Sequence, residues 1–262
     1  MWIWEAAHQP KAVVVLVHSV FEHHRRYAWL IETFRENNFH VVMGDLPGHG
    51  ENTKLKTMHN ESIGEYDLYI ERAIEYASKM ELPIFLAGHG FGATTILYYM
   101  RKPRESIAGI LLTSPWLELH HTPSKWTNRL AKLTISQKLH YKIPTEMYVS
   151  QPELVEEYKT DELVHDVVTT DWYSALTERM KQMAQSSSEW STPVWLQVAG
   201  QDELISVKAV RAWVNQQRMK TLHYSEWAGM KHDLHQEPDR EFLAKSAIDF
   251  MHLMVLRIGY ML

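Results

Sequence analysis

Short apolar runs alternate along this chain with longer segments in which apolar residues recur every three to four positions. Most of the runs are nearly continuous in large apolar residues, as in strands that are buried on both faces. They occupy residues 12–18, 39–45, 83–88, 107–113, 193–199 and 221–227. The segments with helical spacing are residues 27–37, 61–80, 91–101, 207–217 and 238 onward. Strands that alternate with helices predict an α/β fold, a mostly parallel twisted sheet with helices on both faces.

This rhythm is interrupted between residues 114 and 190, where no apolar strand run occurs. Aromatic residues lie there among polar stretches with helical spacing: Trp116, Trp126, Tyr141, Tyr148, Tyr158 and Trp172. The segment leaves from the end of a strand, where α/β proteins bind ligands, and aromatic side chains suit the roof of an apolar pocket. We therefore expect a core formed by residues 1–113 and 191–262 and a helical cap formed by residues 114–190. A surface insertion without function is the alternative.

Composition and charge exclude several classes of function. The 262 residues carry a formal net charge of −5, and 45% of them are hydrophobic. This mild acidity lacks the basic footprint of a nucleic-acid-binding protein, so we expect no nucleic-acid partner. The absence of cysteine excludes disulfides, thiolate metal sites and a cysteine nucleophile. It is compatible with the reducing cytoplasm, which is the location that we expect.

Neither end of the chain has the pattern of a membrane segment. The first residues lack the basic region and apolar stretch of a signal peptide. No run of about 18 apolar residues occurs anywhere, so we expect no transmembrane segment. The apolar residues 250–262 are interrupted by His252 and Arg257, which favours a helix packed on the body of the protein.

The most informative segment is Gly88-His89-Gly90-Phe91-Gly92, between a predicted buried strand and a predicted helix. Its glycine spacing and its setting match the nucleophile elbow G-x-S-x-G, a tight strand-to-helix turn that exposes a serine hydroxyl. The central residue here is Gly90, so the attacking atom is absent.

Two further residues follow the elbow in the order in which enzymes with a nucleophile elbow place the acid and the base of the catalytic triad. Asp202 comes directly after the predicted strand 193–199, and His232 lies in the loop before the last helix. At the front of the chain, His18-Ser19-Val20 follows the first buried strand, where an oxyanion loop is expected. The order of these segments supports a catalytic triad in which only the nucleophile is missing.

With these residues the chain resembles the bacterial lysophospholipase and monoacylglycerol-lipase-like serine hydrolases of the α/β-hydrolase superfamily. The segments that carry the resemblance are residues 1–4, 18–27, 44–50, 88–92, 112–115, 229–232 and 237–238. It implies that Gly90 stands at the nucleophile position, that Asp202 is the orienting acid and that His232 is the general base. It also implies that the backbone N–H groups of Val20 and Phe91 form the oxyanion hole.

The chain departs from the family pattern at three positions. Gly90 replaces the nucleophilic serine, Ser19 replaces the usual glycine after His18, and Ala93 replaces a frequent glycine. The first departure removes the attacking hydroxyl. The other two concern the local geometry of the site.

Other residues compete for the same roles. His235 is the alternative base and Asp45 the alternative acid, while Thr94 and Thr95 carry the nearest hydroxyls on the elbow helix. The pairs His23-His24 and His120-His121 and the pair His232 with His235 suggest metal ligation, but adjacent rings do not easily meet on one ion, and no H-E-x-x-H occurs. We expect neither a metal nor a cofactor.

The resemblance and the aromatic cap together predict a carboxylic-ester hydrolase with an acyl-enzyme mechanism that acts on a small acyl ester or monoacyl lipid, with transient contact with a membrane surface. With Gly90 it is expected to be inactive or nearly so, through an engineered change or a natural loss. Restoring the serine by Gly90→Ser is expected to restore turnover. The alternative is a non-catalytic ligand-binding or scaffold protein with the same fold.

Overall fold

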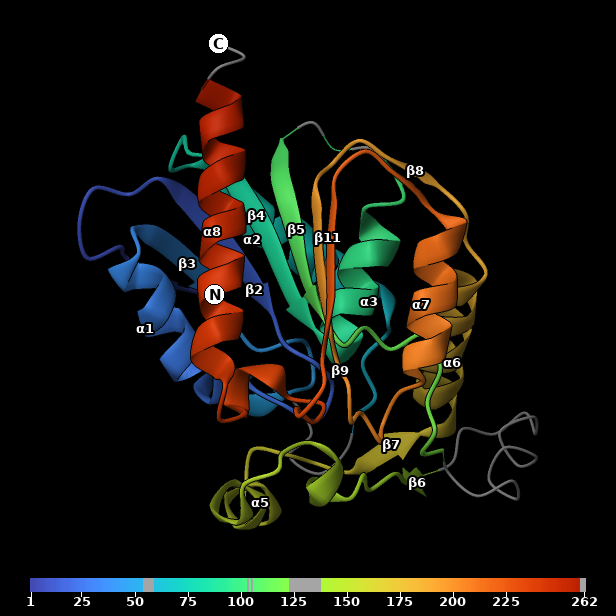
Figure 1. Ribbon diagram of the computed structural model, residues 1–262. Helices are drawn as coiled ribbons and strands as arrows, with labels where there is room; N and C mark the ends of the chain where they lie inside the picture. The colour runs from blue at the N-terminus through green and yellow to red at the C-terminus, as the bar shows by residue number, and fades with distance from the viewer. Residues whose placement is uncertain (54–58, 103, 105, 123–137, 260–262) are drawn as a thin grey trace.

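A seven-stranded sheet forms the centre of the molecule, with strand order β1-β3-β2-β4-β5-β9-β11 (Figure 1). The computed structural model describes residues 1–53, 59–102, 104, 106–122 and 138–259. The strands are β1 (Trp2–Trp4), β2 (Ala12–Val17), β3 (Phe39–Met43), β4 (Ile84–His89), β5 (Ile107–Thr113), β9 (Val194–Ala199) and β11 (Leu222–Trp227). All neighbouring strands are parallel except β1, which pairs with β3 in the antiparallel direction. The predicted α/β sheet is thereby confirmed.

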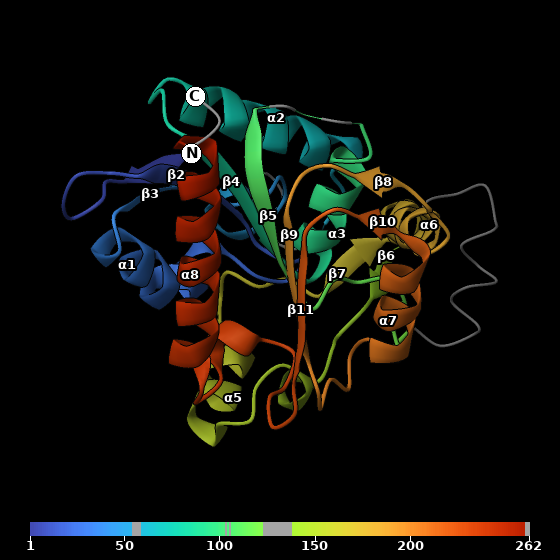
Figure 2. The ribbon, with the colours of Figure 1, turned by 45° about the horizontal axis from the view of Figure 1, so that its top comes forward.

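Helices cover both faces of this sheet. On one face α1 and α8 lie side by side, and on the other α2 and α3 pack with α7 (Figures 1 and 2). These helices are α1 (Ala28–Glu36), α2 (Gly64–Ser78), α3 (Gly90–Tyr99), α7 (Val207–Gln216) and α8 (Arg240–Gly259). The residues of β2 are all buried, because a strand covered on both faces directs every side chain into one of the two cores.

The segment between β5 and β9 is more varied than its sequence predicts. Its described elements are β6 (Lys138–His140), the 3₁₀ turn Thr145–Met147, α5 (Pro152–Lys159), β7 (Val167–Thr169), α6 (Thr170–Ala184) and β8 (Glu189–Trp190). Short strands occur in a segment that was expected to be mostly helical: β6 pairs with β7, and β8 pairs with β10 (Arg218–Met219), which follows α7. The predicted cap residue Trp126 lies outside the described residues.

The elements of this segment lie in two places. The short elements around α5 lie beyond the carboxyl ends of the central strands, at the bottom of Figure 1. By contrast, α6 packs beside α3 and α7 against the core. Arg179 on α6 forms a two-pronged ion pair with Asp67 on α2, with N–O distances of 2.7 Å. Near α5, Arg26 and His23 both bind Asp161, with Arg26 Nη2 and His23 Nε2 each 2.8 Å from Asp161 Oδ2. Charge-assisted bonds therefore fix both parts to the core.

Residues 240–259 form the helix α8, which includes the described part of the C-terminal apolar segment and packs on the sheet with buried residues such as Leu243, Phe250 and Met251. Its outer side exposes Phe242, Leu253 and Leu256. In the described part of the chain, no helix has the length and hydropathy that crossing a bilayer requires.

Candidate active site

The turn from β4 into α3 has the geometry of a nucleophile elbow. Gly90 is the first residue of α3, and its φ angle of +53° lies in the left-handed region that glycine adopts without strain. Gly92 permits a close approach of the neighbouring strand, because a Cβ atom added there would lie 2.4 Å from the carbonyl oxygen of His18. This close approach requires glycine at position 92, and residue 90 stands at the tip of the turn.

The predicted acid and base meet beside this turn. Asp202 follows β9, His232 follows β11, and Nδ1 of His232 lies 2.8 Å from Oδ2 of Asp202. The other carboxylate oxygen, Oδ1, accepts backbone N–H groups from Leu204 and Ile205 at 3.0 Å each. Both paired side chains are fully buried. The carboxylate is therefore held so that it can orient the imidazole.

The second nitrogen of His232 also has a partner. The indole N–H of Trp116 donates a hydrogen bond to Nε2 of His232 over 3.0 Å. Because an indole N–H is only a donor, Nε2 must offer its lone pair, and the ring proton lies on Nδ1, facing Asp202. This is the tautomer of a general base, but its lone pair is engaged by tryptophan rather than by a nucleophile.

The oxyanion loop after β2 supplies a further side chain at this point. The backbone N–H of Phe91 donates to Oγ of Ser19 over 3.0 Å, so this predicted oxyanion donor is occupied by a residue of the chain itself. Val20, the other predicted donor, is fully buried directly after Ser19. Phe21 follows with a φ angle of +62°, a strained value that is typical of functional loops.

The chain is similar to known proteins over most of its length. Residues 8–239 match the profile of a family described as "Serine aminopeptidase, S33". The chain belongs to this α/β-hydrolase family. It is 33% identical over 256 residues to phospholipase YtpA of Bacillus subtilis (strain 168), covering 95% of this chain and 98% of the relative. It is 26% identical over 249 residues to the monoacylglycerol lipase of Mycolicibacterium smegmatis, covering 92% and 88%.

Solved structures give the same assignment of the fold. The monoacylglycerol lipase of Paleococcus ferrophilus superposes with a TM-score of 0.81 at 25% identity, over 97% of this chain and 99% of that one. A soluble variant of the monoglyceride lipase of Saccharomyces cerevisiae gives a TM-score of 0.84 at 14% identity, over 96% and 90%. The second likeness shows the fold alone. The α/β-hydrolase fold predicted from the elbow is confirmed.

The competing residues in this family member have other partners. Asp45 is buried and accepts hydrogen bonds from the His24 backbone N–H at 2.7 Å and the Glu51 N–H at 2.8 Å, so it ties two loops together. Thr94 donates its hydroxyl to the backbone carbonyl of Trp116, and Thr95 donates its hydroxyl to that of Phe91. His235 stacks on Tyr27, and burial lowers its pKa to about 3. The geometry therefore favours Asp202 and His232 for the roles of acid and base.

A second imidazole–carboxylate pair lies next to the first, and the sequence did not single it out. His89 Nε2 binds Oδ1 of Asp233 over 2.9 Å, and His89 Nδ1 lies 3.0 Å from the hydroxyl of Thr113. The other Asp233 oxygen accepts the Tyr158 hydroxyl at 2.9 Å. Oε1 of Glu22, buried and without a hydrogen-bond partner, lies 3.8 Å from His89 Nε2. Only tertiary contact reveals this cluster, since Glu22, His89 and Asp233 are distant in sequence.

Burial and charge shift the pKa values in this cluster. Burial opposes the charged ring of His89, but its hydrogen bond to Asp233 and the nearby Glu22 raise its pKa overall. Burial also opposes the charge of Asp233, yet His89 holds the pKa of that carboxyl well below its usual range. Burial and the Asp233 charge raise the pKa of Glu22. The cluster thus favours an imidazolium held between carboxyl groups.

Among the described residues, His89, His232 and Asp233 are the one group whose ligand atoms come together closely enough for a metal ion, within 4.8 Å. The His89 and Asp233 atoms already bind each other, and both nitrogens of His232 have partners. The suggested pair His23-His24 diverges, because His23 binds Asp161 and His24 binds Asp45. Hydrogen bonding therefore accounts for these groups.

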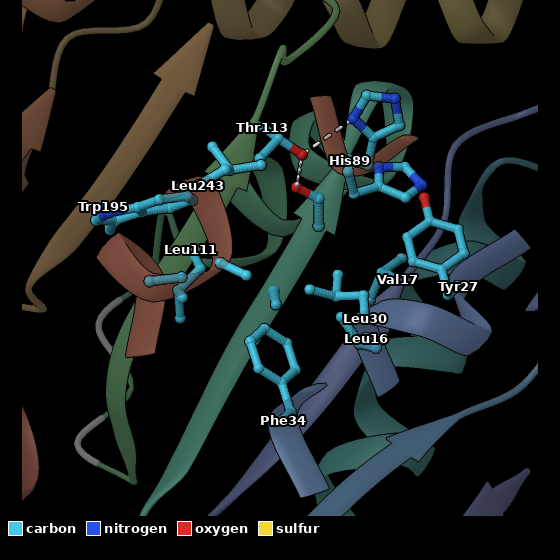
Figure 3. A pocket seen from close by; sticks show the side chains of 15 residues that line it. Leu16, Val17, Tyr27, Leu30, Phe34, His89, Leu111, Thr113, Trp195 and Leu243 are labelled. Carbon is cyan, nitrogen blue, oxygen red and sulfur yellow. Dashed lines mark hydrogen bonds between the residues drawn. The ribbon is translucent and has the colours of Figure 1, made fainter. Parts of the chain in front are cut away.

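Two cavities flank the site. One of about 180 Å³ lies under the segment around α5 and is lined by Phe21, Arg26, Tyr141, Lys142, Ile143, Thr145, Tyr148, Tyr158, Lys159, Asp161, Val164 and Asp166. Tyr148 connects it to the site, since its ring centroid lies 6.0 Å from that of His232. The other, of about 40 Å³, lies on the α1 and α8 face among apolar side chains such as Phe34, Leu111 and Trp195 (Figure 3). The first cavity combines aromatic walls with Arg26, Lys142 and Asp161, whereas the second is lined mainly by apolar side chains.

Proposed function

We propose that this chain has the site of a carboxylic-ester hydrolase of the monoacylglycerol-lipase and lysophospholipase type, but lacks the nucleophile. In this proposal His232 is the general base, Asp202 orients it, and the N–H groups of Val20 and Phe91 are the oxyanion donors. The observation that carries the proposal is the 2.8 Å bond between Asp202 and His232 beside the turn at Gly90.

The expected reaction rate follows from the missing hydroxyl. In a Ser-His-Asp enzyme, removing the serine lowers turnover about a millionfold and leaves roughly 10³–10⁴-fold acceleration over water. A water molecule activated by His232 would need the Nε2 lone pair, which accepts the Trp116 N–H. We therefore infer that the protein binds its ester with little or no turnover.

The substrate class rests on the cavity beside His232 and on the relatives. Phe21, Tyr141 and Tyr148 offer an apolar wall, while Arg26 and Lys142 lie at the same cavity. A monoacylglycerol or a lysophospholipid combines one apolar chain with a polar head, which matches such a lining. The names of the relatives, a phospholipase and monoacylglycerol lipases, support the same class. Residues 114–190 would then act as the cap, and a cytoplasmic location stays a prediction.

The test is binding of a 1-O-alkylglycerol, an ether that cannot be hydrolysed, by isothermal titration. We expect saturable binding, and hydrolysis of the corresponding monoacylglycerol no faster than the residual rate given above. Val164→Arg, which puts a charge into the cavity wall, is expected to weaken binding at least about tenfold. Leu256→Arg is the matched control, because Leu256 is exposed on α8. Absence of binding, or equal effects of the two variants, would contradict the proposal.

A non-catalytic ligand-binding or scaffold protein is the second candidate. Ser19 and Trp116 favour it, because their polar atoms engage Phe91 N–H and His232 Nε2, two groups that an acyl-transfer site leaves to its substrate and nucleophile. Saturable binding of some other ligand class, with no affinity for the ether, would favour this candidate over the first.

A further inference from the structure

The space for a side chain at residue 90 is already filled. A Cβ atom added to Gly90 would lie 2.3 Å from Oγ and 2.8 Å from Cβ of Ser19, and 3.0 Å from the indole nitrogen of Trp116. Real Cβ atoms essentially never come closer than 3.0 Å to such neighbours. A serine at position 90 would therefore collide with Ser19 before its hydroxyl reached any partner.

The two neighbours also take over hydrogen bonds at the place of the missing hydroxyl. Ser19 Oγ accepts the N–H of Phe91, and the Trp116 N–H fills the lone pair of His232 Nε2. Both groups are buried, where an unpartnered donor or acceptor is destabilising. Residue 90 can thus be glycine without leaving the base or the elbow amide unsatisfied.

Both side chains are held in place by their own backbones. The Ser19 N–H donates to Glu22 Oε2 at 3.0 Å, and the Ser19 carbonyl oxygen lies 2.6 Å from Nδ1 of His18. The backbone N–H of Trp116 donates to the carbonyl oxygen of Gly90 at 3.3 Å. The Trp116 carbonyl accepts the Thr94 hydroxyl at 2.8 Å. A rotation of either side chain is possible, but neither backbone can retreat without breaking buried hydrogen bonds.

We propose that the residues at positions 19 and 90 have changed together. Glycine has replaced the serine of the elbow, and Oγ of Ser19, from the oxyanion loop, occupies the space of the lost hydroxyl. The indole N–H of Trp116 makes the hydrogen bond to His232 that this hydroxyl would make. Gly90→Ser alone then does not restore attack, whereas Gly90→Ser together with Ser19→Gly does. The statement about turnover rests on the proposed function, whereas the steric coupling of positions 19 and 90 does not. The expectation that Gly90→Ser suffices is thereby replaced.

Ser19 itself as the nucleophile is the opposing possibility. Its Oγ would have to form a bond to the ester carbonyl carbon while its proton moved to His232 Nε2. That lone pair is bound by the Trp116 N–H, and Ser19 Oγ accepts the Phe91 N–H, a donor meant for the oxyanion. The geometry therefore favours Ser19 as a blocking residue.

The test compares the unmodified protein with Gly90→Ser, Ser19→Gly and the combined variant, by fluorophosphonate labelling with peptide mapping and by monoacylglycerol hydrolysis. We expect labelling only in the combined variant, at residue 90, with hydrolysis at least about a thousandfold above the other three. Trp116→Phe added to the combined variant is expected to raise the rate further, since it frees Nε2 and keeps an aromatic ring. Equal activity of Gly90→Ser alone, or labelling of Ser19 in the unmodified protein, would overturn the proposal.

A double-mutant cycle of thermal stability tests the steric coupling of positions 19 and 90 independently of hydrolysis. Gly90→Ala is expected to lower Tm more when residue 19 is serine than when it is glycine. Gly229→Ala is the matched control, because a Cβ there meets nothing within 4 Å, so its effect should not depend on residue 19. Additive changes in Tm at positions 19 and 90 would overturn the coupling. Coupled changes in Tm without hydrolysis by the combined variant would uphold the joint change at positions 19 and 90 and contradict the proposed function instead.

Discussion

Two imidazole–carboxylate pairs of nearly equal geometry lie side by side in this protein, with ring centroids 4.8 Å apart. In one pair His232 binds Asp202 over 2.8 Å, and in the other His89 binds Asp233 over 2.9 Å. What differs is the partner of the second ring nitrogen and the charge nearby. His232 Nε2 meets a pure donor, the Trp116 N–H, whereas His89 has a hydroxyl on one side and a second carboxyl group, Glu22, on the other.

This difference separates the proposed general base from a structural charge cluster. The indole N–H of Trp116 can only donate, so Nε2 of His232 accepts with a lone pair that a nucleophile could otherwise use. The carboxyl groups around His89 raise its pKa and favour the charged ring, which has no lone pair to offer. The same two residue types therefore give opposite chemistry, and the surroundings decide which.

The largest expected effect is on turnover in the combined variant Ser19→Gly with Gly90→Ser. Adding His232→Gln is expected to lower kcat about a millionfold, because the proposed general base is lost. Adding His89→Gln is expected to leave kcat of the folded protein within about tenfold while lowering the free energy of unfolding. Steady-state kinetics and urea unfolding of both proteins check this. A larger loss of kcat with His89→Gln would reverse the roles of the two pairs.

The next effect is on stability. Asp233→Asn removes the charge that faces the His89 ring in a buried cluster, and we expect a loss of about 3–5 kcal/mol in the free energy of unfolding. Asp249→Asn breaks an exposed ion pair with Lys245 and should cost less than about 1 kcal/mol. Urea denaturation measures both. Equal losses would mean that the cluster around His89 contributes no more than a surface pair.

The smallest single-residue effect is the contribution of one buried neutral histidine to the pH dependence of stability. Burial lowers the pKa of His18 and of His59 to about 4, below the value near 6.5 of the unfolded chain. Between about pH 4 and pH 6.5 the unfolded chain therefore binds more protons than the folded chain. The contribution of the two neutral rings to the free energy of unfolding is present above about pH 6.5 and is lost as pH falls towards 4. For His59 alone the loss is roughly 3 kcal/mol. His89, whose pKa is raised, acts in the opposite sense as pH rises.

Thermal unfolding measured from pH 7 to pH 4 gives the slope of Tm against pH and checks this expectation. His59→Gln is expected to flatten it, since one buried neutral ring no longer titrates, whereas the exposed His8→Gln should leave it unchanged. A Tm that stays constant over this range would show that these rings are not kept neutral by the fold.

Much of the fold was predictable from local pattern. The predicted strand at residues 107–113 matches β5, and the helix at residues 207–217 matches α7 within one residue. Continuous apolar runs and three-to-four spacing report burial directly, so the sequence carries this information residue by residue. The three-residue β1 and the short pairs β6–β7 and β8–β10 escaped prediction, because strands this short depend on their partners rather than on their own pattern.

By itself the sequence determined the α/β rhythm, the elbow spacing around Gly90 and the order in which Asp202 and His232 follow it. Only the tertiary structure decided what stands where the hydroxyl is missing. Ser19 and Trp116 reach that point from loops after different strands, and no local pattern records that the two meet at Gly90. A motif is read along the chain, whereas the space around one atom is shared by segments that only folding brings together.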